Sequence, residues 1–176
     1  MYSYPLSYLS FLAHFHEDRD YFECHEVLEE FWKEKTDQAP DSVWVGLIQM
    51  AVSFYHHRRG NFIGAKKLMT KAVAIFHKRE EELGELSIDR EALLHQLSCR
   101  LREIENEESF TDMAIPFSDT KIVKQYRDFL QSSFLPAEEP AAEYIYHKHK
   151  MRDRSDVLAA REESLRTRRQ LAAAAK

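Results

Sequence analysis

The stretch SVWVGLIQMAVSFYHHRRG, residues 42–60, decides the fold. It begins shortly after Pro40, carries apolar side chains over most of the circumference of a helix, and ends at Gly60, a residue type common just past a helix. A helix that is apolar nearly all round has to be covered by other elements. Its most apolar part, residues 43–55, is shorter than the roughly 20 residues that a membrane span needs. We therefore expect the central helix of a soluble bundle.

The composition also favours an all-α protein. The 176 residues include only 4 Gly and 5 Pro, whereas a β-sandwich or barrel of this length needs many turn residues. With 44% hydrophobic residues, the chain has enough apolar side chains for one core and is not disordered as a whole. We expect an all-α helical bundle of about five core helices with appended C-terminal helices. The breakers and capping residues predict six helices. Their predicted starts and ends are Pro5 for the first, Asp18 or Asp20 as cap of a helix over about 21–35, Pro40-Asp41-Ser42 to Gly60 for the third, Asn61 as cap and Gly84 as end of a helix over 61–84, Ser87 or Asp89 for the fifth, and Ser118 or Asp119 for the sixth.

Three parts are expected along the chain: a helical core domain over 1–110, a loop and docking helix over 111–142, and a basic C-terminal helical arm over 143–176. Within the arm, apolar residues recur at a spacing of seven, beginning with Met151 and Leu158, and this pattern suits contact with a partner helix or another subunit. The other interpretation is a solvated helix or a partly disordered arm. Acidic residues interspersed among the basic ones argue against nucleic acid as the partner. We therefore expect a protein partner or a homo-oligomer, and nucleic acid is disfavoured.

Charge is segregated by segment. Residues 17–41 hold ten acidic and three basic side chains, residues 42–79 hold seven basic and no acidic ones, and residues 80–108 again hold ten acidic and three basic ones. One interpretation is that neighbouring helices of a bundle have complementary surfaces, each exposed pair contributing about 0–1 kcal/mol. The other is an anion-binding surface on the hairpin formed by residues 58–79.

Cysteine usage and the N-terminal residues indicate the compartment. Cys24 and Cys99 both fall inside helical patterns, which indicates reduced thiols rather than a disulfide framework. Residues 1–16 contain no Lys or Arg, so the positive region of a signal peptide is missing. We expect a cytoplasmic protein without a membrane span.

Two predicted helices carry polar side chains where their apolar stripes end. On the helix over 21–35, His25 lies beside Trp32 at the margin of the stripe, and Glu29 follows one turn later. The central helix has its own line of Gly and polar residues, at steps of three and four residues: Gly46, Gln49, Ser53, His56 and Gly60. Because buried polar groups need hydrogen-bond partners, the simplest expectation is that this line faces His25 and Glu29.

This polar cluster has three interpretations. It could be a structural network that fixes helix register, a pocket for a small ligand, or a metal site in which His25, Glu29 and His56 are the nitrogen and oxygen ligands of zinc or iron. The run HEVLE is not the zinc-protease motif, which needs His at position 29. A di-iron bundle is also excluded, because it needs Glu-x-x-His on two helices. The sequence identifies no cofactor.

The same residues resemble a known family. Residues 21–32 (YFECHEVLEEFW), residues 46–49 (GLIQ) and residues 59–65 (RGNFIGA) are similar to the signature of the "domain of unknown function 309" family, over roughly residues 8–108. The resemblance implies a small, bacterial or plastid, all-helical protein and no established activity, cofactor or partner. It also implies that five residues of the motif act together: Glu23, His25, Glu26, Glu29 and Trp32.

Residues 59–65 are also similar to the turn of a tetratricopeptide hairpin, in which small residues let two helices approach closely. A second copy at a 34-residue period is missing, so a single hairpin within the bundle is expected rather than a repeat array.

These observations favour a non-enzymatic interaction or adaptor protein whose buried polar network is mainly structural. The alternative is a small-molecule or metal-dependent enzyme in which His25 acts as ligand or general base and Glu29 orients it or binds metal. The candidate binding residues are Glu23, His25, Glu26, Glu29, Trp32, Gln49, Ser53 and His56.

Overall fold

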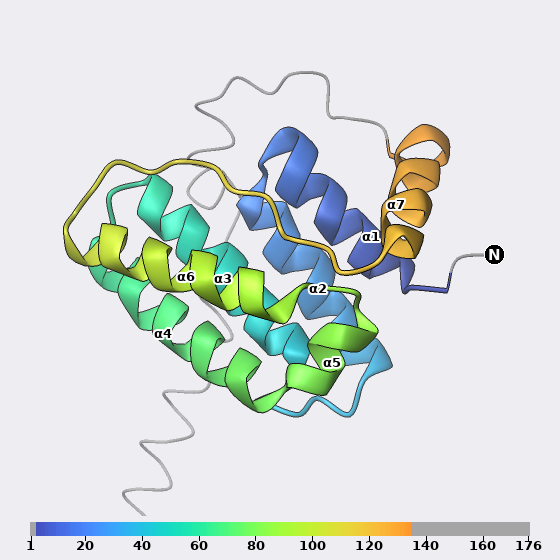
Figure 1. Ribbon diagram of the computed structural model, residues 1–176, viewed down its shortest axis with the longest axis horizontal. Coiled ribbons are helices and arrows are strands. Elements are labelled where there is room, and N and C mark those ends of the chain that lie inside the picture. Colours follow the sequence, from blue (N-terminus) through green and yellow to red (C-terminus); the bar gives the residue numbers. More distant parts are fainter. Residues whose placement is uncertain (1–2, 135–176) are drawn as a thin grey trace, which may run out of the picture. The chain divides into compact units, whose positions relative to one another are not determined.

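The computed structural model describes residues 3–134, which form seven α-helices and one π-helical turn (Figure 1). The helices are α1 (Leu6–Ala13), α2 (Tyr21–Lys35), α3 (Val43–Arg58), α4 (Phe62–Lys78), α5 (Glu80–Glu85), α6 (Arg90–Glu105) and α7 (Thr120–Ser132), with the π-helical turn His14–Asp18 after α1. The protein is therefore all-α, as the composition predicts. The predicted arm over 143–176 and the last residues of the segment over 111–142 lie outside the described residues.

Side-chain caps fix where most helices begin. The side chains that accept hydrogen bonds from first-turn N–H groups are those of Asp20 for α2, Ser42 for α3, Asn61 for α4, Asp89 for α6 and Asp119 for α7. Four of these starts lie at the capping residues proposed from the sequence for that purpose, and Ser42 lies within the predicted start of α3. After α3, Gly60 has φ +69°, a left-handed conformation that favours glycine.

The prediction of one helix over 61–84 is wrong, because the helix is interrupted at Arg79. This residue has φ −113° and ψ 41°, so α4 ends at Lys78 and α5 begins at Glu80. The Arg79 guanidinium donates to the Asp41 carboxylate at 2.8 Å and to the Asp41 backbone oxygen at 3.0 Å. It also donates to Glu82 at 2.9 Å. The contact with Asp41 joins residues 38 apart in the chain, so no local sequence pattern reveals it.

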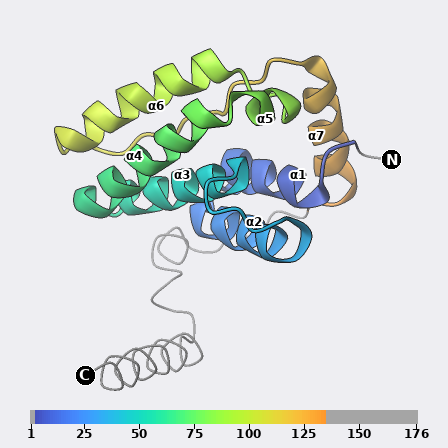
Figure 2. The same cartoon turned by 90° about the horizontal axis from the view of Figure 1, so that it is seen from below.

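Helix α3 lies between α2 and α4 (Figure 2). Its residues Leu47, Met50 and Phe54 are fully buried, which agrees with the prediction of a central helix. Helix α4 packs closely against α3 at Gly46, where an added Cβ would lie 2.6 Å from Cε1 of Phe76. A side chain at this position would therefore push the two helices apart.

Residues 106–119 cross the bundle without forming a helix and connect α6 to α7 (Figure 1). We call this segment the strap. Arg100 donates to the Thr111 backbone oxygen at 2.6 Å, and the Tyr21 hydroxyl donates to the Asp112 carboxylate at 2.6 Å. After the strap, α7 contacts α1 and buries Ile122, Tyr126 and Phe129. Long-range hydrogen bonds thus replace regular secondary structure in holding the strap.

None of the described helices combines the length and the apolar character needed to cross a lipid bilayer.

Candidate functional site

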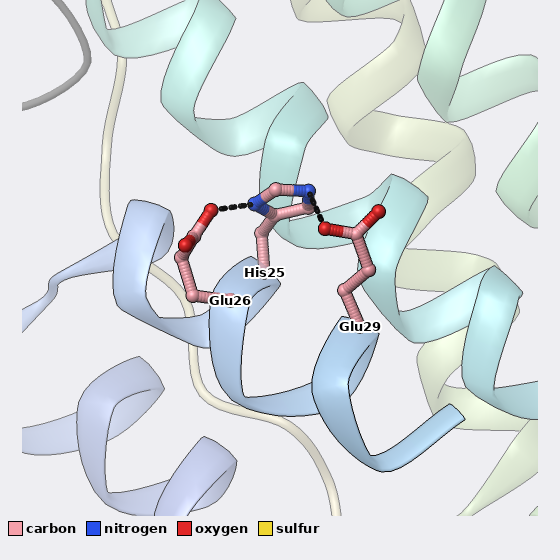
Figure 3. A group of neighbouring side chains, drawn as sticks. All are labelled: His25, Glu26 and Glu29. Carbon is pink, nitrogen blue, oxygen red and sulfur yellow. Dashed lines mark ion pairs between the residues drawn. The ribbon is translucent and has the colours of Figure 1, made fainter. Parts of the chain in front are cut away.

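His25 has a carboxylate beside each of its ring nitrogens (Figure 3). Its Nδ1 lies 3.2 Å from Oε1 of Glu26, and its Nε2 lies 3.5 Å from Oε2 of Glu29. The three side chains are partly exposed, at 24% for His25, 28% for Glu26 and 37% for Glu29. Solvent therefore screens the charges, and the cluster is accessible from outside the protein.

The sequence of α2 places this cluster at the edge of the core. Tyr21, Cys24 and Leu28 are buried, which leaves His25 at the margin of the buried stripe. The Phe22 ring lies 5.9 Å from the His25 ring and 5.8 Å from the Tyr55 ring of α3, measured between centroids. Phe22 thus lies near both the imidazole and the Tyr55 ring of α3.

A charge of opposite sign follows one turn further along α2. The Nζ atom of Lys33 lies 3.1 Å from Oε1 of Glu29, so Glu29 contacts both His25 and Lys33. The acidic and basic groups alternate in the order Glu26, His25, Glu29, Lys33. When the imidazole is protonated, Nδ1 can donate to Glu26 and Nε2 can donate to Glu29. Ion pairing alone therefore accounts for this geometry, and no ligand is required.

The three groups are also close enough to serve one metal ion. One ligand atom from each of His25, Glu26 and Glu29 can be chosen so that all three lie within 4.8 Å of one another. Because the two carboxylates lie at opposite ring nitrogens, an ion bound to either nitrogen has only one of them beside it. The other carboxylate would have to rotate around the imidazole to complete a site with three protein ligands.

The prediction that the polar line of α3 faces His25 and Glu29 is wrong. The Ser53 hydroxyl is fully buried and donates to the Ala65 backbone oxygen of α4 at 2.7 Å. Gly46, at the start of the line, lies against Phe76 of α4. Steps of three and four residues define one face of a helix, but they do not say which neighbouring helix that face meets. Here it meets α4.

His56 belongs to the turn between α3 and α4 rather than to the cluster on α2. Its Nδ1 lies 2.9 Å from Nδ2 of Asn61, the residue that caps α4. Burial lowers the pKa of His56, and the nearby Arg59 adds to that effect. Within the described residues, the group that could hold a metal ion contains Glu26 and not His56, so the predicted trio of His25, Glu29 and His56 is not brought together.

The remaining candidates have separate surroundings. The indole N–H of Trp32 donates to the Ala39 backbone oxygen at 3.2 Å, which brings the loop before α3 onto α2. The backbone N–H of Glu23 donates to the capping Asp20. The Oε1 atom of Gln49 is buried and has no hydrogen-bond partner among the described residues.

A surface that the sequence did not predict lies along α3. Three β-branched residues at steps of three and four, Val45, Ile48 and Val52, are partly exposed between α2 and α4. We call these residues the α3 strip. An apolar pattern all round a helix predicts burial all round, so the sequence contains no signal that distinguishes this side.

Opposite charges lie on the two sides of the α3 strip. On α2, Glu26 and Glu29 are partly exposed. On α4, Lys71 is exposed and lies one turn before Ile75, which packs against Gly46 of α3. The side of α4 facing α6 is a different one, where Lys66 pairs with Glu105 at 3.0 Å. We call the α3 strip together with Glu26, Glu29 and Lys71 the contact face.

The comparisons with known proteins confirm the family resemblance. The model of the family described as "Domain of unknown function (DUF309)" matches residues 8–68. The chain is 36% identical over 169 residues to the "Uncharacterized protein YpuF" of Bacillus subtilis (strain 168), and the match covers 94% of this chain and 97% of the relative. No solved structure matches the chain.

Proposed function

Because the chain belongs to the family of domain of unknown function 309, whose description states no activity, we propose from the site that it is a non-enzymatic interaction protein that binds a polypeptide through the contact face. The supporting observation is the α3 strip, an apolar line left partly exposed on the central helix. Protein interfaces typically have an apolar centre and a polar rim. The contact face has this composition, with the strip at its centre and Glu26, Glu29 and Lys71 at its rim.

The chemistry of the strip also supports binding. Val and Ile side chains have few rotamers, so they lose little conformational entropy when a partner covers them. Each square ångström of apolar surface removed from water contributes roughly 25 cal/mol. In this proposal, the ion pairs of His25 hold two rim carboxylates in place and carry no reaction.

A photoreactive residue tests the proposal directly. We would place p-benzoylphenylalanine at Val52, irradiate living cells, and identify the polypeptide in any covalent adduct by peptide sequencing. The matched control carries the same group at Glu91 of α6, whose side chain is 88% exposed. We expect an adduct from position 52 and none from position 91.

The identified polypeptide would then be purified and titrated against the wild-type chain and the Val52→Arg variant. We expect binding by the wild-type chain and at least tenfold weaker binding by the variant, because Arg places a charge in the apolar centre. Equal yields of adduct from positions 52 and 91, or equal affinity of the two chains, would refute the proposed function.

Divalent-metal binding, with metal-dependent chemistry on a small molecule, is the second candidate. It is favoured by the closeness of the ligand atoms of His25, Glu26 and Glu29. Calorimetric titration with Zn²⁺ tests it, using His25→Ala and Glu26→Gln against the control His56→Ala. This candidate is supported if the wild-type chain binds Zn²⁺ stoichiometrically, and if His25→Ala abolishes that binding, Glu26→Gln weakens it and His56→Ala leaves it unchanged. Absence of stoichiometric binding by the wild-type chain would remove it.

A further inference from the structure

We propose that the occupant of the contact face is a second copy of this chain, related to the first by a two-fold axis that runs parallel to α3. This inference rests on the proposed function, because it uses the same face. It adds the identity of the partner and the geometry of the complex, which follow from where the charges on α2 and α4 lie along α3.

The position of Glu26 along α3 follows from ring contacts between α2 and α3. The Phe22 ring lies 5.8 Å from the Tyr55 ring, and the Phe31 ring lies 4.8 Å from the Trp44 ring. Helix α2 therefore runs antiparallel to α3. Glu26 is about midway between Phe22 and Phe31, so it lies level with the middle of α3, near residues 49–50.

The position of Lys71 follows in the same way from the contacts between α4 and α3. Ser53 donates to the Ala65 backbone oxygen at 2.7 Å, and a Cβ on Gly46 would lie 3.1 Å from Cγ2 of Ile75. Helix α4 therefore also runs antiparallel to α3. Lys71 falls between Ala65 and Ile75 and is level with the same part of α3. Glu26 and Lys71 thus lie at one height, on opposite sides of the α3 strip.

A two-fold axis parallel to α3 makes use of this arrangement. Rotation by 180° about that axis preserves height and exchanges the two sides of the face. It brings Glu26 opposite Lys71 of the partner subunit, and Lys71 opposite Glu26 of the partner subunit. An axis across α3, lying in the plane of the face and passing at this height, would instead place Glu26 opposite Glu26 of the partner subunit. Because like charges repel, charge complementarity selects the axis parallel to α3.

The α3 strip fits the same symmetry. The proposed axis makes the two copies of α3 parallel, and the strip residues Val45, Ile48 and Val52 follow the three- and four-residue steps of a heptad seam. Valine at the first and last of these positions is a β-branched residue of the kind that parallel two-stranded seams favour there, whereas Ile48 lies where such seams favour leucine. The apolar centre and the charged sides of the face therefore point to the same axis.

Charge reversal tests this geometry in the full-length chain. We would measure the dimer dissociation constant by analytical ultracentrifugation for the wild type, Glu26→Lys, Lys71→Glu and the double variant. In a symmetric dimer each single reversal turns two attractive pairs into repulsive ones, so we expect each to weaken the dimer about tenfold or more. The double variant exchanges the charges within each pair, and we expect it to regain most of the affinity.

Matched controls separate the interface from general effects of charge. Glu91→Lys on α6 and Lys124→Glu on α7 change exposed charges away from the contact face, and we expect no effect on the dimer. Circular dichroism and thermal melting of every variant check that the fold is retained.

The proposal fails if the wild-type chain stays monomeric up to millimolar concentration, or if the double variant dimerises no better than the single ones. The two proposals can fail separately. A covalent adduct from position 52 that contains a different polypeptide would refute the proposal that the partner is a second copy of this chain. It would not contradict the proposed function. Absence of any adduct specific to position 52 would refute binding through the contact face and, with it, both proposals.

Discussion

The ring nitrogen Nε2 of His16 accepts a hydrogen bond of 2.9 Å from the backbone N–H of Ile115 and so attaches the strap to the π-helical turn. The acceptor nitrogen must be unprotonated. Burial lowers the pKa of His16 to about 4, and nearby Arg19 adds to that effect while Glu17 opposes it. In the unfolded chain the pKa returns to about 6.5. Between these values the unfolded state binds more protons than the folded state, so the free energy of unfolding should fall as the pH drops from 6.5 to 4.

The loss should be on the order of 3 kcal/mol, since each unit of pKa difference corresponds to about 1.4 kcal/mol. Urea unfolding at a series of pH values measures it. The control is His16→Gln, which does not titrate in this range, and its stability should fall less over the same interval. If both proteins lose stability equally between pH 6.5 and 4, His16 is not responsible for the acid sensitivity.

Gly46→Ala should destabilise the protein, although alanine is the better helix former. The added Cβ would lie 2.6 Å from Cε1 and 3.0 Å from Cδ1 of Phe76, which is fully buried. Overpacking of this kind costs about 1–3 kcal/mol, and the gain in helix propensity of about 1 kcal/mol offsets only part of it. Because 2.6 Å is far inside van der Waals contact, the upper part of that range applies, and we expect the free energy of unfolding to fall by about 1–2 kcal/mol in urea denaturation.

Gly84→Ala is the matched control, because a Cβ at Gly84 has no atom within 4 Å. Gly84 lies in α5, so we expect this variant to be as stable as the wild type or up to about 1 kcal/mol more stable. A Gly46→Ala protein as stable as the wild type would mean that α4 moves away from α3 without cost.

Ser53→Ala should remove a buried side-chain hydrogen bond between α3 and α4. The hydroxyl is fully buried and donates to the Ala65 backbone oxygen. Loss of a buried hydrogen bond costs about 1 kcal/mol, and urea denaturation should show a decrease of that size. Ser98→Ala, which removes an exposed bond to the Leu94 backbone oxygen, should change stability by much less. Equal effects of the two substitutions would contradict this assignment.

Much of the fold could be predicted from the sequence, because helix starts depend on local chemistry. Asp20, Asn61, Asp89 and Asp119 lie next to the turns that they cap, and Gly60 supplies the left-handed residue after α3. The break at Arg79 could not be predicted, because it accompanies a contact with Asp41. The strap was expected only as a loop, since the bonds that hold it join distant residues.

The candidate site was predictable only where it lies within one helix. The pairing of His25 with Glu29 follows from their spacing of one turn on α2. To predict whether Gln49, Ser53 or His56 contacts these residues, one must know how α3 is rotated about its axis relative to α2. A helical-wheel projection of a single helix does not contain that rotation. The exposed α3 strip was missed for a related reason. Its residues are as apolar as those on the buried sides, and only the positions of the neighbouring helices decide which side stays partly uncovered.

Tyr21→Phe should loosen the strap and leave α2 folded. The Tyr21 hydroxyl donates to the Asp112 carboxylate at 2.6 Å, while its ring packs 5.3 Å from the Phe54 ring. Phenylalanine keeps the ring and removes the hydroxyl. Hydrogen bonds to charged groups contribute about 1.5–3 kcal/mol, so backbone amides near Asp112 should exchange with deuterium roughly tenfold or more faster. Amides of α2 should change much less, and hydrogen-exchange mass spectrometry resolves the two segments.

Tyr126→Phe is the comparison, because it removes the 2.6 Å bond to Glu17 and should affect α7 instead. Uniformly faster exchange in α2 and the strap would show that Tyr21 stabilises the whole fold rather than this attachment.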